Sequence, residues 1–234
     1  MKSLLMINAS GRVTRSVTRQ LTARFADGWR ARQPSAEIIA RDVGVHPPLP
    51  VDEAWIAAAF ATSESRSAEM QEALALSDAL SDEIVRADAI VLGVPMYNFG
   101  MPGQLKSYID QIVRIGRTFA FDLTAADPYL PLLESKPVII VISAGDGSVH
   151  PGGALAHLNF LEPHLQTILG FIGLTDLHFV RVGYDEYQDD RFAQSIGAAQ
   201  VTLEGILDRL TTRTPSPGQA DLTPLPMPAT LAVA

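Results

Sequence analysis

The sequence predicts an α/β domain in which a five-stranded parallel sheet, with the doubly wound strand order 2-1-3-4-5, carries helices on both faces. Three observations lead to this prediction. Strand-like and helix-like segments alternate along the 234 residues. Two strand-like segments, 89–94 and 137–143, are almost continuously apolar, as expected of central parallel strands covered on both sides. The segments between strands are long enough to return the chain by right-handed helical crossovers.

The first half of the chain begins with a short apolar run at 3–8, which predicts a buried strand. The segment 16–32 follows, and apolar residues spaced four apart give it one helical stripe. These residues are Val17, Leu21, Phe25 and Trp29. A second strand is expected at 37–41, and helices are expected at 53–61 and 67–87 after a proline-containing loop.

The second half repeats the alternation of strand and helix. The expected elements are strands at 89–94, 137–143 and 177–182, each followed by a helix, at 103–114, 154–171 and 189–210. After Thr211 the composition changes, and five of the last 20 residues are proline. We therefore expect a domain at 1–210 and a proline-rich tail at 211–234 that is flexible or lies over a neighbouring subunit.

The composition argues against several classes of protein. The net charge of −8 disfavours nucleic-acid binding, which normally requires a basic surface. No stretch of 18 uncharged apolar residues predicts a membrane span. The absence of cysteine excludes disulfides, thiolate catalysis and cysteine-ligated zinc, and the five histidines form no compact metal-binding motif. We expect a cytoplasmic protein that acts on small molecules and holds no metal.

In doubly wound sheets, ligands bind at the carboxyl ends of the strands, and the loop after the first strand is suited to a phosphate. It leads into a helix N-terminus, where free N–H groups and the helix dipole favour an anion. Ser10, Ser16 and Thr18 add hydroxyls, while Arg12 and Arg15 add charge. The alternative is an ordinary turn with Ser16 as the N-cap. The loop lacks the glycine patterns of dinucleotide and ATP sites.

The loop after the third strand concentrates aromatic and apolar residues. It reads Pro95, Met96, Tyr97, Asn98, Phe99, Gly100, Met101 and Pro102. Exposed apolar residues at a strand end are unfavourable unless a flat ligand or a partner covers them, and the prolines stiffen the backbone. A loop folded over the core is the alternative.

The loop after the fourth strand, 143–153, is rich in glycine. Gly145 and Gly147 let the backbone approach a ligand closely, and Ser143 is placed to reach a ring heteroatom. An ordinary mobile loop is the alternative. Together the three loops suit a phosphate and a flat heterocycle, which predicts flavin mononucleotide (FMN) as the ligand.

The third-strand loop also carries a family resemblance. The run 95–102, with Gln104-Leu105-Lys106 and Tyr108-Ile109-Asp110 after it, resembles the flavin loop of FMN-dependent NADH-azoreductases, also called NADH:quinone oxidoreductases. The stretches 71–78 and 171–176 are similar to two further parts of that family. The resemblance covers residues 1–210 and implies a flavodoxin-like fold.

The resemblance implies a homodimer with two FMN sites at its interface and ping-pong hydride transfer from NADH or NADPH to a quinone or an azo compound. Its flavin site assigns the phosphate to Ser10, Ser16 and Thr18, next to Val17. The same resemblance assigns the isoalloxazine ring to Pro95, Met96, Tyr97, Asn98 and Phe99, and the pyrimidine side to Ser143, Gly145 and Gly147. No side chain is assigned as catalytic, because the flavin itself does the chemistry.

Two positions depart from the family pattern. Val17 stands where the family often has a side chain that hydrogen-bonds the phosphate, and Asp146 is acidic where a basic residue is expected. An acidic group beside the flavin would disfavour an anionic reduced state. A flavodoxin-like one-electron carrier and a flavin-free regulatory module are the two alternatives, since one fold supports many functions.

Overall fold

The computed structural model describes residues 2–124 and 126–212. Its elements follow one another as β1 (Ser3–Asn8), α1 (Val17–Arg32), β2 (Glu37–Asp42), α2 (Glu53–Phe60), η1 (Ser63–Ser65), α3 (Ala68–Arg86), β3 (Ala89–Pro95), α4 (Gly103–Ile112), β4 (Phe119–Phe121), β5 (Tyr129–Pro131), β6 (Val138–Ser143), η2 (Gly147–Val149), η3 (Ala156–Leu158), α5 (Leu161–Phe171), β7 (Leu177–Val182) and α6 (Asp190–Thr212), where η marks a 3-10 helix.

The main sheet has five strands in the order β2-β1-β3-β6-β7. Every pairing between them is parallel. Numbered by their place among these five strands, the order is 2-1-3-4-5, so the predicted topology is confirmed. The order reverses direction at β1, and the loops after β1 and β3 therefore open toward each other at the carboxyl edge.

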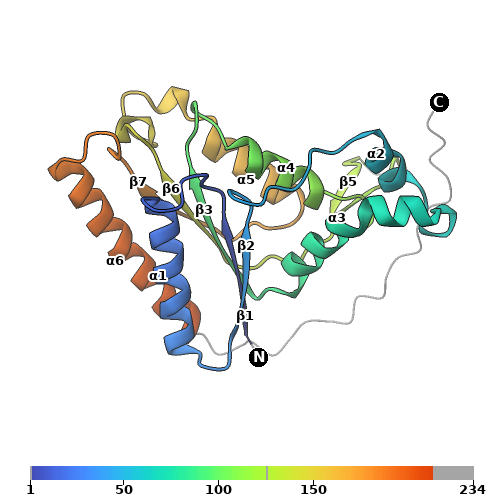
Figure 1. Cartoon of the computed structure of the whole chain (residues 1–234), viewed down its shortest axis with the longest axis horizontal. Helices are drawn as coiled ribbons and strands as arrows, with labels where there is room; N and C mark the ends of the chain where they lie inside the picture. The colour runs from blue at the N-terminus through green and yellow to red at the C-terminus, as the bar shows by residue number, and fades with distance from the viewer. Residues whose placement is uncertain (1, 125, 213–234) are drawn as a thin grey trace.

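Helices cover both faces of this sheet (Figure 1). Helices α1 and α6 lie side by side on one face, and α3, α4 and α5 lie on the other. The central strands β3 and β6 are buried along almost their whole length. Their alternate side chains enter two separate cores: Val91 and Ile139 face α1 and α6, whereas Leu92 and Ile140 face the opposite layer.

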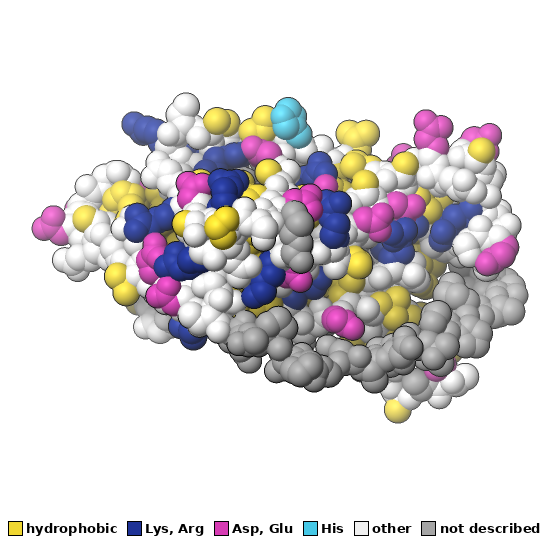
Figure 2. All heavy atoms as spheres, turned by 90° about the horizontal axis from the view of Figure 1, so that it is seen from below, with side chains coloured by type: hydrophobic (Ala, Val, Ile, Leu, Met, Phe, Trp, Pro, Cys, Tyr) yellow, Lys and Arg dark blue, Asp and Glu magenta, His cyan; other side chains and the backbone are white. Residues whose placement is uncertain are grey.

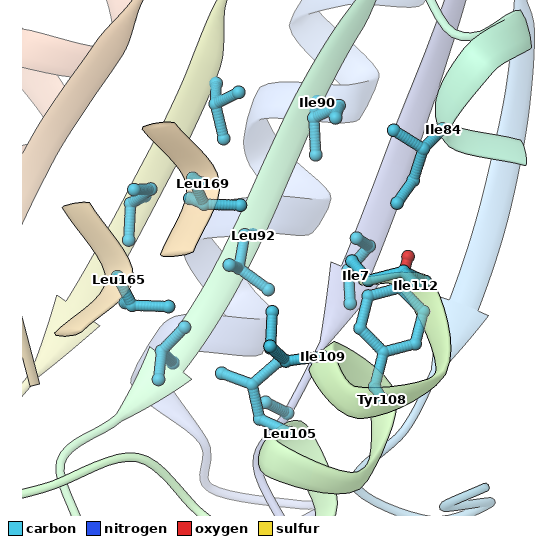
Figure 3. Packing of buried hydrophobic residues seen from close by; sticks show 14 of the residues in the cluster. Ile7, Ile84, Ile90, Leu92, Leu105, Tyr108, Ile109, Ile112, Leu165 and Leu169 are labelled. Atoms are coloured by element: carbon cyan, nitrogen blue, oxygen red, sulfur yellow. The ribbon is translucent and has the colours of Figure 1, made fainter. Parts of the chain in front are cut away.

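The larger core lies under α4 and α5. Figure 3 shows Leu92 of β3 pointing toward Ile109 of α4 and Leu165 of α5. These side chains are at most 3% exposed. Burial of each large aliphatic side chain stabilises the fold by about 1.5–3 kcal/mol. This packing fixes β3 and β6 rigidly, so their carboxyl ends are a firm support for the loops that follow.

The predicted helix at 154–171 is wrong in its first part. The chain there forms η3, and the regular helix α5 begins only at Leu161. Asn159 has an extended backbone, and its side-chain oxygen accepts the Glu162 N–H at 3.1 Å. An asparagine that bonds the nearby backbone in this way competes with helix continuation and marks a helix start instead.

The hairpin of β4 and β5 was not expected from the sequence. Its strands are three residues each, too short to show a period-two pattern. Aromatic contacts hold it against α5: the ring centres of Phe119 and Tyr129 lie 5.0 and 5.3 Å from that of Phe171. Tertiary packing rather than local propensity stabilises this element.

Helix α6 ends at Thr212, two residues beyond its expected end. The rest of the predicted tail, 213–234, lies outside the described residues. None of the helices in the described part of the chain combines the length and the apolar character that a membrane crossing needs. On the face shown in Figure 2, basic side chains lie among acidic ones rather than in a stripe of their own.

Candidate functional site

A small cleft opens at the carboxyl edge of the sheet, where the loops after β1, β3 and β6 meet. Its volume is about 140 Å³. The residues that line it are Ser10, Arg12, Ser16, Val17, Thr18, Pro95, Met96, Tyr97, Ser143, Gly145, Asp185 and Glu186. All of these except Asp185 and Glu186, ten residues, were singled out from the sequence, and the fold brings them together here. Asn98, Phe99 and Gly147 belong to the same loops but do not line the cleft.

The first wall of the cleft is the N-terminus of α1. Ser16 is the N-cap, and its hydroxyl accepts the Arg19 N–H at 3.3 Å. The Ser16 and Thr18 hydroxyls lie 3.2 Å apart, and both residues are buried. Ser16 thus acts as an ordinary N-cap and also lines the cleft. The hydroxyl pair and the free N–H groups of the first turn form a site that favours an anion.

Arg19, which the sequence reasoning missed, anchors this wall from behind. Its guanidinium donates to the carbonyl oxygen of Ser10 at 2.6 Å and to that of Arg12 at 3.1 Å. It also makes a bidentate pair with Asp42, at 2.6 and 2.7 Å. The hydrogen bond from Arg19 lowers the pKa of Asp42, so the carboxylate stays charged. Because one guanidinium binds both carbonyl oxygens, it restrains the loop after β1.

The second wall is a tight turn after β3. Tyr97 and Gly100 exchange two backbone hydrogen bonds of 3.0 Å each. Between them Asn98 and Phe99 have φ angles of 48° and 66°, the left-handed conformation that a type I′ turn requires. Asparagine adopts it readily, but phenylalanine does not, so the turn holds strain at about the 1–3 kcal/mol level. Both side chains point away from the core and are exposed.

The third wall begins at Ser143, the last residue of β6. Its backbone oxygen accepts the Met96 N–H at 2.8 Å, which ties the second and third walls together. Its side-chain oxygen is buried, and no partner for it exists among the described residues. Buried hydroxyls are almost always paired, so this oxygen is suited to a ligand in the cleft.

The two glycines of this wall have a structural role that the sequence did not reveal. A Cβ atom on Gly145 would lie 2.4 Å from the Glu186 side chain, and one on Gly147 would lie 2.6 Å from the Tyr184 ring. Both glycines therefore make room for the segment after β7. That segment adds Asp185 and Glu186 to the cleft and is held by Arg191. The Arg191 guanidinium lies over the rings of Tyr184 and Tyr187, 4.6 and 4.5 Å from their centres.

Asp146 does not line the cleft. Its carboxylate accepts the backbone N–H of Ser148 at 2.8 Å and caps η2. This hydrogen bond lowers the pKa of Asp146. The acidic side chains that do line the cleft are Asp185 and Glu186, and Asp185 is 3.7 Å from Arg12. Sequence position gave no signal for them, because they lie some 40 residues from the nearest expected site residue.

A larger hollow of about 690 Å³ lies between α5 and β7. It runs along β7, outside the cleft, and its two charged residues, Glu162 and Arg181, neutralise each other through a hydrogen-bonded pair. Elsewhere in residues 2–124 and 126–212, no group of three or more acidic or histidine side chains is arranged to hold a metal ion.

Comparison with known proteins identifies the family. Residues 2–203 match a family described as having a flavodoxin-like fold. An FMN-dependent NADH:quinone oxidoreductase of Opitutus terrae is 51% identical over 210 residues, which are 90% of this chain and 99% of that protein. The chain belongs to the FMN-dependent NADH:quinone oxidoreductase family. A second member, from Nostoc punctiforme, is 43% identical over 204 residues, 87% of this chain and 97% of that protein.

Solved structures agree with the fold of this family. An azoreductase from Bacillus anthracis superposes with a TM-score of 0.79 at 21% identity, covering 89% of this chain and all of the other. An FMN-dependent NADH-azoreductase from the same species, solved in complex with FMN, gives 0.78 at 19% identity, covering 91% of this chain. The resemblance stated from the loop after β3 is thus confirmed.

Proposed function

We propose that the chain binds FMN in the cleft at the carboxyl edge of the sheet and uses it to transfer a hydride from NADH to a quinone or an azo compound. The observation that carries this proposal is the buried hydroxyl of Ser143, which has no partner in the described part of the chain and lies in the cleft of a protein whose family is named for its use of FMN. Bound FMN would supply the redox chemistry, accepting the hydride and passing it on.

The first wall is suited to the FMN phosphate. The hydroxyls of Ser16 and Thr18 are 3.2 Å apart at a helix N-terminus, which supplies donors and a favourable dipole. Val17 contributes its backbone N–H, so its apolar side chain does not weaken the assignment. The Arg12 side chain is 58% exposed and lies 3.7 Å from Asp185, so its guanidinium can also reach an anion in the cleft.

The isoalloxazine ring requires a further wall. Small-molecule sites measure about 300–1,000 Å³, more than twice the cleft of this chain. Beside the cleft, Tyr97, Phe99 and Phe160 are 40, 46 and 64% exposed. Phe160 donates its N–H to the Phe99 carbonyl at 3.0 Å, so these residues form one apolar patch. We propose that a second copy of the chain covers this patch and completes the flavin site at a homodimer interface.

No side chain needs to act as a nucleophile in this reaction. The side chains in or next to the three loops that can supply a proton to the product are Tyr97, His150 and Asp146. Of these, Tyr97 lines the cleft, whereas Asp146 caps η2 and His150 contacts the Val182 carbonyl. Tyr97 and water are therefore the proton sources in this proposal. A ping-pong order, in which the nicotinamide leaves before the acceptor enters, suits so small a cleft.

FMN titration of the flavin-free chain tests the binding step, with the quenching of flavin fluorescence as the signal. Thr18→Val should weaken FMN binding about tenfold, because it removes one hydrogen bond to a charged group. Thr22→Val is the matched control. Thr22 is equally buried one turn further on, but its hydroxyl bonds Asn8 at 2.8 Å instead of facing the cleft. Equal losses for the two variants, or no saturable binding by the wild-type chain, would reject the assignment.

A further inference from the structure

Glu162 is a buried carboxylate outside the cleft that the proposed reaction does not use. It lies in the first turn of α5, and its side chain is 8% exposed. Arg181 of β7 donates to it from Nε at 3.0 Å and from Nη2 at 2.5 Å, and Asn159 donates at 2.9 Å. The His150 Nδ1 atom lies 3.6 Å from its Oε1.

His150 joins Glu162 to the third wall of the cleft. Its Nε2 atom lies 3.1 Å from the Val182 carbonyl oxygen. A carbonyl oxygen accepts hydrogen bonds, so Nε2 carries the hydrogen. Nδ1 is buried without a hydrogen-bond partner among the described residues and faces the Glu162 carboxylate. The Glu162 carboxylate therefore lies directly behind the imidazole ring and bears on where the ring sits.

Two contacts with the Val182 carbonyl oxygen close the segment 144–150 of the third wall into a ring. This oxygen accepts the N–H of Ala144, next to Ser143, at 2.9 Å, and it also receives His150 Nε2. The first and last residues of the segment 144–150 are therefore held at the same atom. Inside the ring, His150 N–H bonds the Gly147 carbonyl at 3.2 Å. A shift of the His150 ring would release one end of the segment that carries Gly145.

We propose that Glu162 is a positioning residue, which acts through His150 to hold the segment 144–150, and with it Ser143, in the conformation that binds FMN. This inference rests on the proposed function. The Glu162 carboxylate is charged at neutral pH: burial raises its pKa, but the nearby His150 ring and the hydrogen bonds from Arg181 outweigh burial and lower the pKa to about 2. A permanently charged anchor behind the wall holds it in one arrangement before the ligand arrives.

The variant Glu162→Gln removes the charge at nearly constant size. Glu83→Gln is its matched control, because the Glu83 side chain, 15% exposed, is also a largely buried carboxylate paired with an arginine. That arginine, Arg41, lies on β2, at the opposite edge of the sheet from β7. FMN dissociation constants are measured by fluorescence quenching at a temperature where circular dichroism shows both variants folded. We expect FMN binding about tenfold weaker for Glu162→Gln and within about twofold of wild type for Glu83→Gln.

A double-mutant cycle tests whether the effect passes through His150. His150→Gln keeps a donor for the Val182 carbonyl and leaves the Glu162–Arg181 pair in place, so it remains measurable even where Glu162→Gln unfolds. It should weaken FMN binding on its own, and the double variant should bind FMN no more weakly than His150→Gln does. The inference is overturned if the losses of FMN affinity in the two single variants add up in the double variant, or if Glu162→Gln and Glu83→Gln lose equal affinity. In both cases FMN binding by the wild type, and with it the proposed function, is unaffected. A wild-type chain that binds no FMN overturns both the inference and the proposed function.

Discussion

Replacing Ser143 with alanine should separate the stability of the protein from its affinity for FMN. The Ser143 residue is 6% exposed, and its hydroxyl has no partner among the described residues. A buried hydroxyl without a partner costs about 1–3 kcal/mol. Ser143→Ala should therefore leave the free energy of unfolding of the flavin-free protein unchanged or raise it by about 1 kcal/mol. The same change removes one hydrogen bond to FMN, worth about 1–1.5 kcal/mol, and should weaken binding about tenfold.

Urea unfolding followed by circular dichroism and FMN fluorescence titration measure the two quantities separately. Ser81→Ala is the control, because the Ser81 hydroxyl is also buried, has no partner within residues 2–124 and 126–212, and lies on α3, away from the cleft. It should affect unfolding in the same direction and leave FMN affinity unchanged. The reasoning is refuted if Ser143→Ala binds FMN as tightly as the wild type, or if it destabilises the flavin-free protein by more than about 1 kcal/mol.

Three further predictions concern the core, the turn after β3 and the response to acid. The Tyr108 hydroxyl is buried without a partner in the described part of the chain, and burial raises its pKa well above the usual range. Tyr108→Phe should therefore raise the free energy of unfolding in urea titrations or leave it unchanged. A loss of stability above about 1 kcal/mol would contradict this. Asn98→Val should lower the free energy of unfolding by about 1–2 kcal/mol and weaken FMN retention, because a β-branched residue is strained at a φ of 48°. Asn98→Gly should be tolerated. Thermal unfolding of the two variants tests this, and equal stability would refute it. The pKa of Glu162 falls from its ordinary 4.5 to about 2 in the folded protein, so its stabilisation of about 3 kcal/mol is present above the higher value and is lost as the pH falls toward the lower one. The stability difference between wild type and Glu162→Gln should therefore shrink between neutral pH and about pH 3, and a constant difference would count against this.

Much of the fold could be predicted from the sequence because the parallel sheet is buried on both faces. Runs such as 89–94 can hardly be anything but central strands, and the alternation with amphipathic helices then restricts the topology. The hairpin of β4 and β5 could not be predicted, because its three-residue strands are fixed by aromatic contacts with Phe171 rather than by their own pattern. The late start of α5 follows from the Asn159 side chain, a local competition that periodicity does not report.

The part of the candidate site that could be predicted consists of residues in the loops after β1, β3 and β6. Ser10, Tyr97 and Ser143 are brought together because parallel strands end at one edge. The supporting residues were not predictable. Arg19 and Glu162 act on the loops from within helices, and charged residues on helices are usually solvated. The role of Gly145 and Gly147 was predicted from ligand approach, but their neighbours Glu186 and Tyr184 became visible only in three dimensions.

The absorbance spectrum of the purified protein with added FMN, followed anaerobically through additions of NADH and then a small quinone, tests the central claim most directly. We expect protein-bound flavin bands that bleach on addition of NADH and return when the quinone is added. Flavin bands that persist in the presence of NADH would contradict hydride transfer from NADH and favour a one-electron carrier. A protein that remains colourless after incubation with FMN would contradict the account as a whole.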